Sequence, residues 1–337
     1  MPSPRRATSP ADLAPAVFST AGVAAPHRVE LWEAHNATAL IGLDVRAPGP
    51  LEATEVNVQL PRARLARVTA SAHAVERSED VIARCPADSI AIYLALRGDA
   101  WFTGADGTYR LRPGQAVVCA ADQPFARRFP GGLEELVVTV PCSALPGYLD
   151  ASLAQPKISL FSASGGASRP GGDAASGAAT GLSQYTRALA RLAGRATRAA
   201  RPLPPDEAAV IDLAAVLTSG GAAAPATAHR AAARSYIEEH LTSPELGAER
   251  IAAAVGISDR QLSRVFAADG TSVPRHILAR RLALAHALLS STRPGPETVA
   301  DVAARCGFTS AAYFSHVFRQ HFGHRASDLR RQEPARG

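Results

Sequence analysis

An internal repeat in the last third of the chain restricts what this region can fold into. The segment RIAAAVGISDRQLSRVF, residues 250–266, resembles DVAARCGFTSAAYFSHVF, residues 301–318. Matched positions are 51 residues apart up to the pair of Ile257 with Phe308 and 52 apart from the pair of Ser258 with Ser310 onward, so the second copy has one extra residue in its turn. The matched pairs are Ile251 with Val302, Gly256 with Gly307, Ile257 with Phe308, Ser258 with Ser310, Leu262 with Phe314, Val265 with Val317, and Phe266 with Phe318. This agreement predicts two copies of one supersecondary unit.

Each copy has the pattern of a helix, a tight turn and a second helix. Gly256 and Gly307 permit the left-handed backbone conformation that ends the first helix. Ser258 and Ser310 are placed to cap the second helix by accepting hydrogen bonds from its free N–H groups. The sequence therefore predicts two helix-turn-helix units, whose second helices span 258–268 and 310–322.

The outer face near the start of each second helix could enter the major groove of DNA. The outward side chains are Arg260, Ser263 and Arg264 in the first copy, and Ala312, Ser315, His316 and Arg319 in the second. Arginine can hydrogen-bond guanine through two donors, whereas alanine offers only apolar contact with a thymine methyl. We therefore expect the first unit to read sequence and the second to position the protein. The alternative for the arginines is a solvated helix face.

The two units are joined by the segment VPRHILARRLALAHALL, residues 273–289. Its apolar residues recur at three- and four-residue steps, which predicts one long helix. Such a helix could hold two recognition helices about one DNA turn apart, roughly 34 Å. Arg280 and Arg281 on this helix are candidates either for phosphate contact or for helix packing.

Charge and cysteine content narrow the class of protein. Residues 229–337 contain 15 arginines and no lysine against 10 acidic residues, and the whole chain carries a net charge of +6. This excess suits a polyanion such as DNA. No apolar run reaches the roughly 18 residues of a membrane span, and no apolar stretch follows the first arginines, so we expect neither membrane insertion nor secretion. Four widely spaced cysteines without a C-x-x-C pair indicate no zinc site and a cytoplasmic protein.

The first part of the chain has the pattern of a β-sandwich or barrel. Short β-prone runs alternate with Gly- and Pro-containing turns. The expected strands are Ile90–Leu96, Trp101–Thr103, Tyr109–Leu111, Ala116–Cys119 and Leu136–Val140.

Between the two ends, residues 162–181 are rich in Gly, Ser and Ala and predict a flexible linker. Residues 182–228 have helical periodicity. Two copies of the chain could pair through these helices, which would suit a reader of palindromic DNA. The alternative is that the helices pack on the β domain.

The repeat residues carry a resemblance to a known family. The segment from Arg234 to Arg331 resembles the DNA-binding domain of AraC/XylS-type transcriptional regulators, and VADVAARCGFTSAAYFSHVFRQHFG, residues 299–323, resembles its signature second unit. The resemblance implies a seven-helix module with recognition helices in adjacent major grooves. By position it assigns base reading to Arg260, Ser263, Arg264, Ala312, Ser315 and His316. Family members often have polar residues at 311 and 312 and arginine at 316, so the second helix departs from the pattern.

Residues 90–141 resemble the AraC-binding-like, cupin-related sensor domain of such regulators. The resemblance implies a small-molecule effector pocket inside a β-barrel, for which Tyr93, Trp101 and Phe102 are candidate lining residues, with core packing as the alternative for each. Metal-dependent cupins carry clustered His and Glu ligands. Here only His73 lies in the middle of the β region, so we expect no metal and no cofactor.

Together these features predict a multidomain α+β protein. It has an N-terminal β-barrel or jelly-roll-like sensor domain at 13–150, the linker at 162–181, the helical segment at 182–228 as a possible dimerisation element, and a C-terminal all-α domain with two helix-turn-helix units at 229–332. The expected function is sequence-specific, ligand-responsive regulation of transcription. The expected partners are double-stranded DNA, RNA polymerase, a small-molecule effector of unknown identity and a second copy of the chain.

Two other functions remain as alternatives. One is a cupin-type enzyme with an appended helical domain, although the sequence lacks G-x-S-x-G, H-E-x-x-H and a phosphate loop. The other is an architectural DNA binder without sequence preference.

Overall fold

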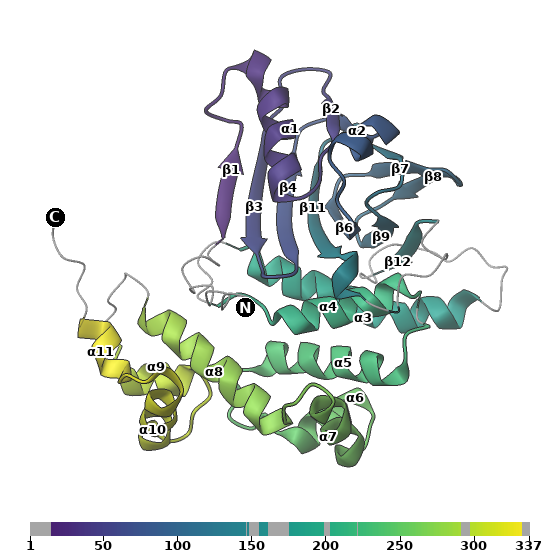
Figure 1. The fold of residues 1–337 in the computed structure, drawn as a ribbon. Helices are drawn as coiled ribbons and strands as arrows, with labels where there is room; N and C mark the ends of the chain where they lie inside the picture. The colour runs from purple at the N-terminus through teal and green to yellow at the C-terminus, as the bar shows by residue number, and fades with distance from the viewer. Residues whose placement is uncertain are drawn as a thin grey trace, which may run out of the picture. The chain divides into compact units, whose positions relative to one another are not determined.

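The computed structural model describes residues 15–145, 147, 155–160, 175–198, 203–220, 222–290 and 297–331. The chain forms two compact units, drawn in Figure 1. The first comprises Met1–Ala199 with Glu207–Ala231, and the second comprises Ala200–Asp206 with Ala232–Gly337. Helix α5 (Pro225–His240) therefore contributes residues to both units.

Two antiparallel sheets form most of the first unit. The seven-stranded sheet has the order β1-β3-β4-β11-β6-β9-β12, and the five-stranded sheet has the order β2-β5-β10-β7-β8. The strands are β1 (Ala16–Ser19), β2 (Asp44–Arg46), β3 (Ala53–Gln59), β4 (Arg64–Ala70), β5 (His73–Arg77), β6 (Ser89–Arg97), β7 (Ala100–Gly104), β8 (Gly107–Leu111), β9 (Gln115–Ala120), β10 (Phe125–Phe129), β11 (Leu133–Pro141) and β12 (Lys157–Leu160). The five strands expected from the sequence are β6, β7, β8, β9 and β11, and each begins and ends within three residues of its predicted bounds.

The seven-stranded sheet is buried on both faces. Along β11, Val137 faces the five-stranded sheet, whereas Leu136 and Val138 face a second core that includes helices α3 (Ala175–Ala196) and α4 (Glu207–Thr218). Successive strand residues point to opposite faces, so a sheet covered on both sides needs apolar residues at consecutive positions. This is why β6 reads IAIYLAL and not as an alternating pattern.

Two helices pack against these sheets. Helix α1 (Arg28–Ala39) buries Trp32 against the core between the sheets. Helix α2 (Glu79–Arg84) begins after Ser78, whose hydroxyl accepts a hydrogen bond from the Val81 N–H. Short 3-10 turns, η2 (Ala25–His27) and η3 (Cys142–Ala144), precede α1 and follow β11.

Helices α3 and α4 correct the prediction of a separate helical segment at 182–228. Both lie in the same compact unit as the sheets, and Leu189 and Leu192 of α3 are buried in the core that they share with the seven-stranded sheet. The apolar faces of these helices thus pack on the β domain, and pairing of two chains through them stays a prediction. The predicted linker at 162–181 also changes: residues 162–174 lie outside the described residues, and 175–181 belong to α3, where alanines favour helix.

The second unit is all helical. Besides the C-terminal part of α5, its helices are α6 (Ala248–Val255), α7 (Asp259–Ala267), α8 (Val273–Leu289), α9 (Val299–Arg305), α10 (Ala311–Phe322) and α11 (Ala326–Arg331). Leu203, from the segment before α4, also packs in this unit.

Helix α8 belongs to two hydrophobic cores. Val273 and Ile277 pack with α5, α6 and α7, whereas Leu282, Ala285 and Leu289 pack with α9, α10 and α11. In Figure 1, α6 and α7 lie at one end of α8, and α9 and α10 lie at the other. One helix therefore spaces the two helix-turn-helix units.

No described helix combines the length and the apolar character that a membrane span requires. Over the same residues, no cluster of three or more His, Cys, Asp or Glu side chains could hold a metal ion.

Candidate nucleic-acid interface

The first helix-turn-helix is built as the sequence predicts. Gly256 follows α6 with φ of 76°, in the left-handed region, and its N–H bonds back to the carbonyl of Ala252 at 2.9 Å. Ser258 caps α7 by accepting a hydrogen bond from the Gln261 N–H at 3.2 Å. Leu262, Val265 and Phe266 are buried. The turn and the core together fix which face of α7 is exposed.

That exposed face contains the predicted reading residues of the first unit. Arg260, Ser263 and Arg264 are all exposed. Within the part of the chain that the structure describes, neither guanidinium forms an ion pair, whereas Arg250 on α6 pairs with Glu245 at 2.6 Å. Two free guanidinium groups one helical turn apart can reach into the same groove.

The second helix-turn-helix repeats the construction with a different first cap. Thr298 and Asp301 form a reciprocal capping box at the start of α9. Gly307 has φ of 84°, and Ser310 caps α10 by accepting from the Tyr313 N–H at 3.2 Å. Phe314, Val317 and Phe318 are buried. The outer residues Ala312, Ser315, His316 and Arg319 are exposed.

The exposed face of α10 is poorer in hydrogen-bond donors than that of α7. The Ser315 hydroxyl donates to the Ala311 carbonyl at 2.9 Å, which occupies its proton within the helix. Tyr313 is 53% exposed and was not among the residues singled out from the sequence. An exposed aromatic residue on the third position of a recognition helix is the signal that could have identified it.

Arg280 and Arg281 adopt the packing alternative rather than lying free for phosphate. The Arg280 side chain donates to both carboxylate oxygens of Glu238, at 2.7 and 3.0 Å, and to the Pro204 carbonyl at 2.8 Å. Burial acts to lower the pKa of Arg280, but the Glu238 carboxylate, through its charge and its hydrogen bonds together, has the larger effect, so the pKa is raised overall. Arg281 donates to the carbonyls of Leu241 and Ser243 at 2.9 and 2.6 Å. Both side chains hold α8 against the segments around it.

Arg275 is an exposed cation on the same helix that sequence reasoning did not select. It follows the Ser272 cap of α8 and lines a groove of about 540 Å³ between α8 and α10, together with Thr271, Gln320 and His321. Arg275 is exposed and forms no ion pair within the described ranges. Its local sequence does not distinguish it from Arg280 and Arg281, so the sequence held no signal that would have selected it.

The aromatic residues suggested for the sensor domain divide between core and surface. Tyr93 and Phe102 are buried between the two sheets. Trp101 lies on the outer side of the five-stranded sheet and lines a surface hollow with Arg128. The structure does not bring the three together.

Comparison with known proteins agrees with this architecture. The family model of the AraC-binding-like domain matches residues 32–243, more than half of the chain, and that of a helix-turn-helix domain matches residues 251–332. The chain belongs to the AraC/XylS family of transcriptional regulators. The expected fold class, a cupin-like N-terminal domain followed by a helical domain, is thereby confirmed.

Individual AraC-family relatives match to different extents. The transcriptional activator NphR from Rhodococcus sp is 27% identical over 279 residues, which cover 80% of this chain and 77% of NphR. The transcriptional activator RhrA from Rhizobium meliloti is 32% identical over 101 residues, which cover 30% of this chain and only 32% of RhrA. The crystal structure of the AraC-like transcriptional activator CuxR aligns over 80% of this chain and 94% of its own, at 19% identity and a TM-score of 0.43.

Proposed function

We propose that this AraC-family protein is a ligand-responsive transcriptional activator that reads DNA sequence mainly through α7. The observation that carries the proposal is the exposed face of α7, with two unpaired arginines held rigidly by a capped helix and a buried core. Bidentate arginine–guanine contact is the commonest specific contact in the major groove. The activator role is supported by the names of the relatives NphR and RhrA.

The second unit has a different role in this proposal. Helix α10 presents Ala312, Ser315 and His316, which offer a thymine-methyl contact and few base-specific hydrogen bonds. Helix α10 therefore occupies the adjacent major groove and sets the position of the protein, with Arg319 available to phosphate. Discrimination between sequences is then concentrated in the half-site of α7.

Arg275 takes the phosphate-contact role that the sequence offered to Arg280 and Arg281. Its guanidinium is exposed in the groove between α8 and α10, whereas those of Arg280 and Arg281 are engaged inside the unit. A phosphate contact adds affinity uniformly across sequences and increases the salt dependence of binding.

The remaining partners follow from the family and stay proposals. The protein acts in the cytoplasm as a homodimer that contacts RNA polymerase. Because its relatives NphR and RhrA are transcriptional activators, a regulator is favoured over the alternative of a cupin-type enzyme.

Binding measurements on selected DNA test the reading role. The full chain is used to select a preferred site from random duplexes, and affinity is then measured for that site and for single-base variants. Arg260→Ala and Arg264→Ala should each cost about 1–3 kcal/mol at one base pair and relax specificity there. Arg250→Ala is the matched control, because this exposed arginine is paired with Glu245.

Two results would contradict the proposal. If the chain shows no preference between its selected site and random duplex, it is an architectural binder. If His316→Ala and Ser315→Ala relax specificity while the α7 variants do not, the assignment of the main reader to α7 is wrong.

A further inference from the structure

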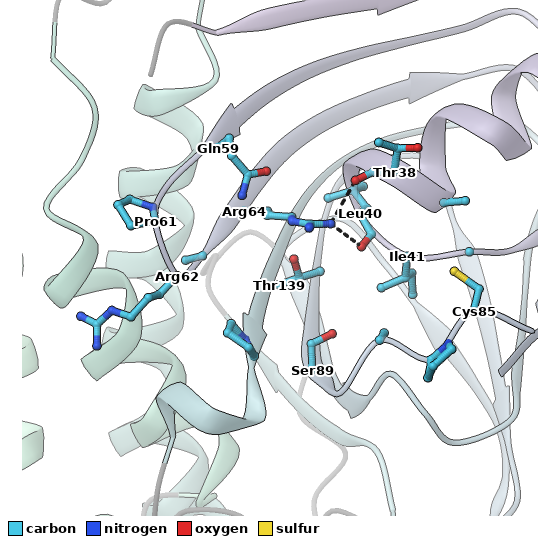
Figure 2. Close-up of a pocket in the computed structure, with 16 residues that line it drawn as sticks. Thr38, Leu40, Ile41, Gln59, Pro61, Arg62, Arg64, Cys85, Ser89 and Thr139 are labelled. Carbon is cyan, nitrogen blue, oxygen red and sulfur yellow. Dashed lines mark hydrogen bonds between the residues drawn. The ribbon is translucent and has the colours of Figure 1, made fainter. Parts of the chain in front are cut away.

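The first unit holds a small polar pocket between the seven-stranded sheet, the end of α1 and the loop before β6. Figure 2 shows side chains that converge there from the end of α1, from strands β3 and β4, from the loop before β6 and from β11. The pocket has a volume of about 300 Å³. Its polar lining residues include Gln59, Arg64, Cys85, Ser89 and Thr139. We call it the Arg64 pocket.

The space deeper between the sheets is filled. Arg127 donates to both carboxylate oxygens of Glu135, at 2.9 and 2.6 Å, and its guanidinium lies 3.8 Å from the centre of the Tyr93 ring. The rings of Phe102 and Phe125 stack beside it at 5.3 Å. This ion pair and these rings occupy the interior that an effector could otherwise enter.

Arg64 supplies an uncompensated positive charge to the pocket. One terminal nitrogen donates to the carbonyls of Thr38 and Leu40, at 3.1 and 3.3 Å, drawn as dashed lines in Figure 2. A guanidinium has five N–H donors, so the other nitrogen atoms keep donors to offer. Over the residues that the structure describes, no carboxylate pairs with Arg64, whereas the neighbouring Arg62 turns away from the pocket to Glu207. A half-buried cation without a counter-charge favours an anionic ligand.

Neutral groups beside Arg64 add directional recognition. Thr139 is its cross-strand partner on β11, and Gln59 is its partner on β3. Ser89 and Thr139 are buried side chains that line the pocket with their hydroxyl groups. The planar guanidinium matches the geometry of a carboxylate, and the hydroxyls can bond to a second polar group on the same ligand.

The far wall of the pocket is held in place by hydrogen bonds within the protein. Arg77, which is fully buried, donates to the carbonyls of Gly42 and Cys85 at 2.7 and 2.9 Å, and to the carboxylate of Asp122 at 2.6 Å. Asp122 in turn accepts from the N–H groups of Ala87 and Asp88. A site whose walls are held in place loses less conformational entropy on binding.

We propose that the Arg64 pocket binds the effector, and that the effector is a small hydroxy-carboxylate. This inference rests on the proposed ligand-responsive function and names the chemistry of its ligand. The volume lies at the lower end of ligand pockets, which run from about 300 to 1,000 Å³. A carboxylate meets Arg64, and a hydroxyl on the ligand meets Thr139 and Ser89.

Protection of Cys85 from alkylation measures occupancy in the full chain. Cys85 lines the pocket, and the comparably half-buried Cys142 lies outside its lining and serves as the internal control. The probes are L-lactate, D-glycerate and L-malate, compared with lactamide, glycerol and inorganic phosphate. At least one carboxylate should slow alkylation of Cys85 and leave Cys142 unchanged.

Variants test the two contacts separately. Arg64→Gln should weaken protection by about ten- to a hundredfold, the size of a lost charge-assisted hydrogen bond. Thr139→Val keeps the side-chain shape, leaves α1 untouched and should weaken protection by roughly two- to tenfold. Arg128→Gln, on the outer side of the other sheet, should change nothing.

Each other outcome overturns the inference. Equal protection by lactamide or glycerol excludes charge recognition, and stronger protection by inorganic phosphate replaces the carboxylate by phosphate. No protection by any of the three carboxylates refutes the site and the ligand class. DNA binding to the selected site is measured on the same samples, so that loss of the proposed function is seen independently of the pocket.

Discussion

Replacing Arg280 by alanine separates the two roles that its position on α8 allows. In the structure its side chain is 15% exposed, and that of its partner Glu238 is 5% exposed. The variant removes three hydrogen bonds and leaves the Glu238 carboxylate buried without its cation. Removing one partner of a buried ion pair costs about 3–5 kcal/mol of folding free energy. For a unit of roughly a hundred residues, the melting temperature should fall by about 12 °C or more.

The assay can assign this loss to the second unit. Both tryptophans of the chain, Trp32 and Trp101, lie in the first unit, so their fluorescence follows that unit alone. The helical second unit contributes strongly to far-ultraviolet circular dichroism. In Arg280→Ala, the transition followed by circular dichroism should move to lower temperature, and the tryptophan transition should stay in place.

Salt titration of DNA binding supplies the refuting result. Each phosphate contact changes the slope of log affinity against log salt by about 0.9. Arg275→Ala, five residues away on the same helix, should reduce the slope by about one contact and leave the melting temperature unchanged. If Arg280→Ala instead reduces the slope and melts like the parent protein, the packing role of Arg280 is wrong.

Three further predictions concern stability. Gly256→Ala should lower the free energy of unfolding in urea by about 1–2 kcal/mol, the strain of a left-handed residue, because the space around its Cβ is open. Gly307→Ala should lower it further, because its Cβ would lie 3.0 Å from the Thr242 carbonyl oxygen and from Arg281. Glu135→Gln should cost about 3–5 kcal/mol by tryptophan-monitored urea unfolding, because Arg127 stays buried without an anion. Burial acts to raise the pKa of Asp122, yet the Ala87 and Asp88 N–H groups and Arg77 lower it overall. Ionised Asp122 therefore stabilises the fold above its unfolded pKa, and this stabilisation is lost as pH falls through the lower folded pKa. In Asp122→Asn, the free energy of unfolding should fall less steeply as pH is lowered.

The helix-turn-helix units were predictable because their determinants are local. A glycine at the turn, a serine cap two or three residues later and apolar residues at helical spacing all lie within about twenty residues, and each is found in its expected role. The exposed residues of both recognition helices follow directly from that register. No partner distant in sequence is needed to decide which face of α7 points outward.

The first unit was predictable in part, in strands that are apolar or that lie between clear Gly- and Pro-containing turns. Strands β6 and β11 can be recognised from the sequence, because both of their faces are buried and their residues are apolar at consecutive positions. Strands β3, β4 and β10 carry arginines and glutamates whose burial depends on partners in other strands, as in the pair of Arg127 with Glu135. The polar interior and the Arg64 pocket arise from strand pairing, and a linear pattern of residue types does not encode which strands become neighbours.

Arg280, Arg281 and Arg275 show the same limit within one helix. All three are arginines on α8, and their positions in the sequence make each of them an equally good candidate for contact with a DNA phosphate. What distinguishes them is the set of acceptors near each: Glu238 lies 42 residues before Arg280, Pro204 lies 76 residues before it, and Leu241 lies 40 residues before Arg281. Arg275 has no such acceptor in the described chain and keeps its charge at the surface. Whether an arginine of a basic helix can contact DNA therefore depends on whether its guanidinium already donates to acceptors inside the protein.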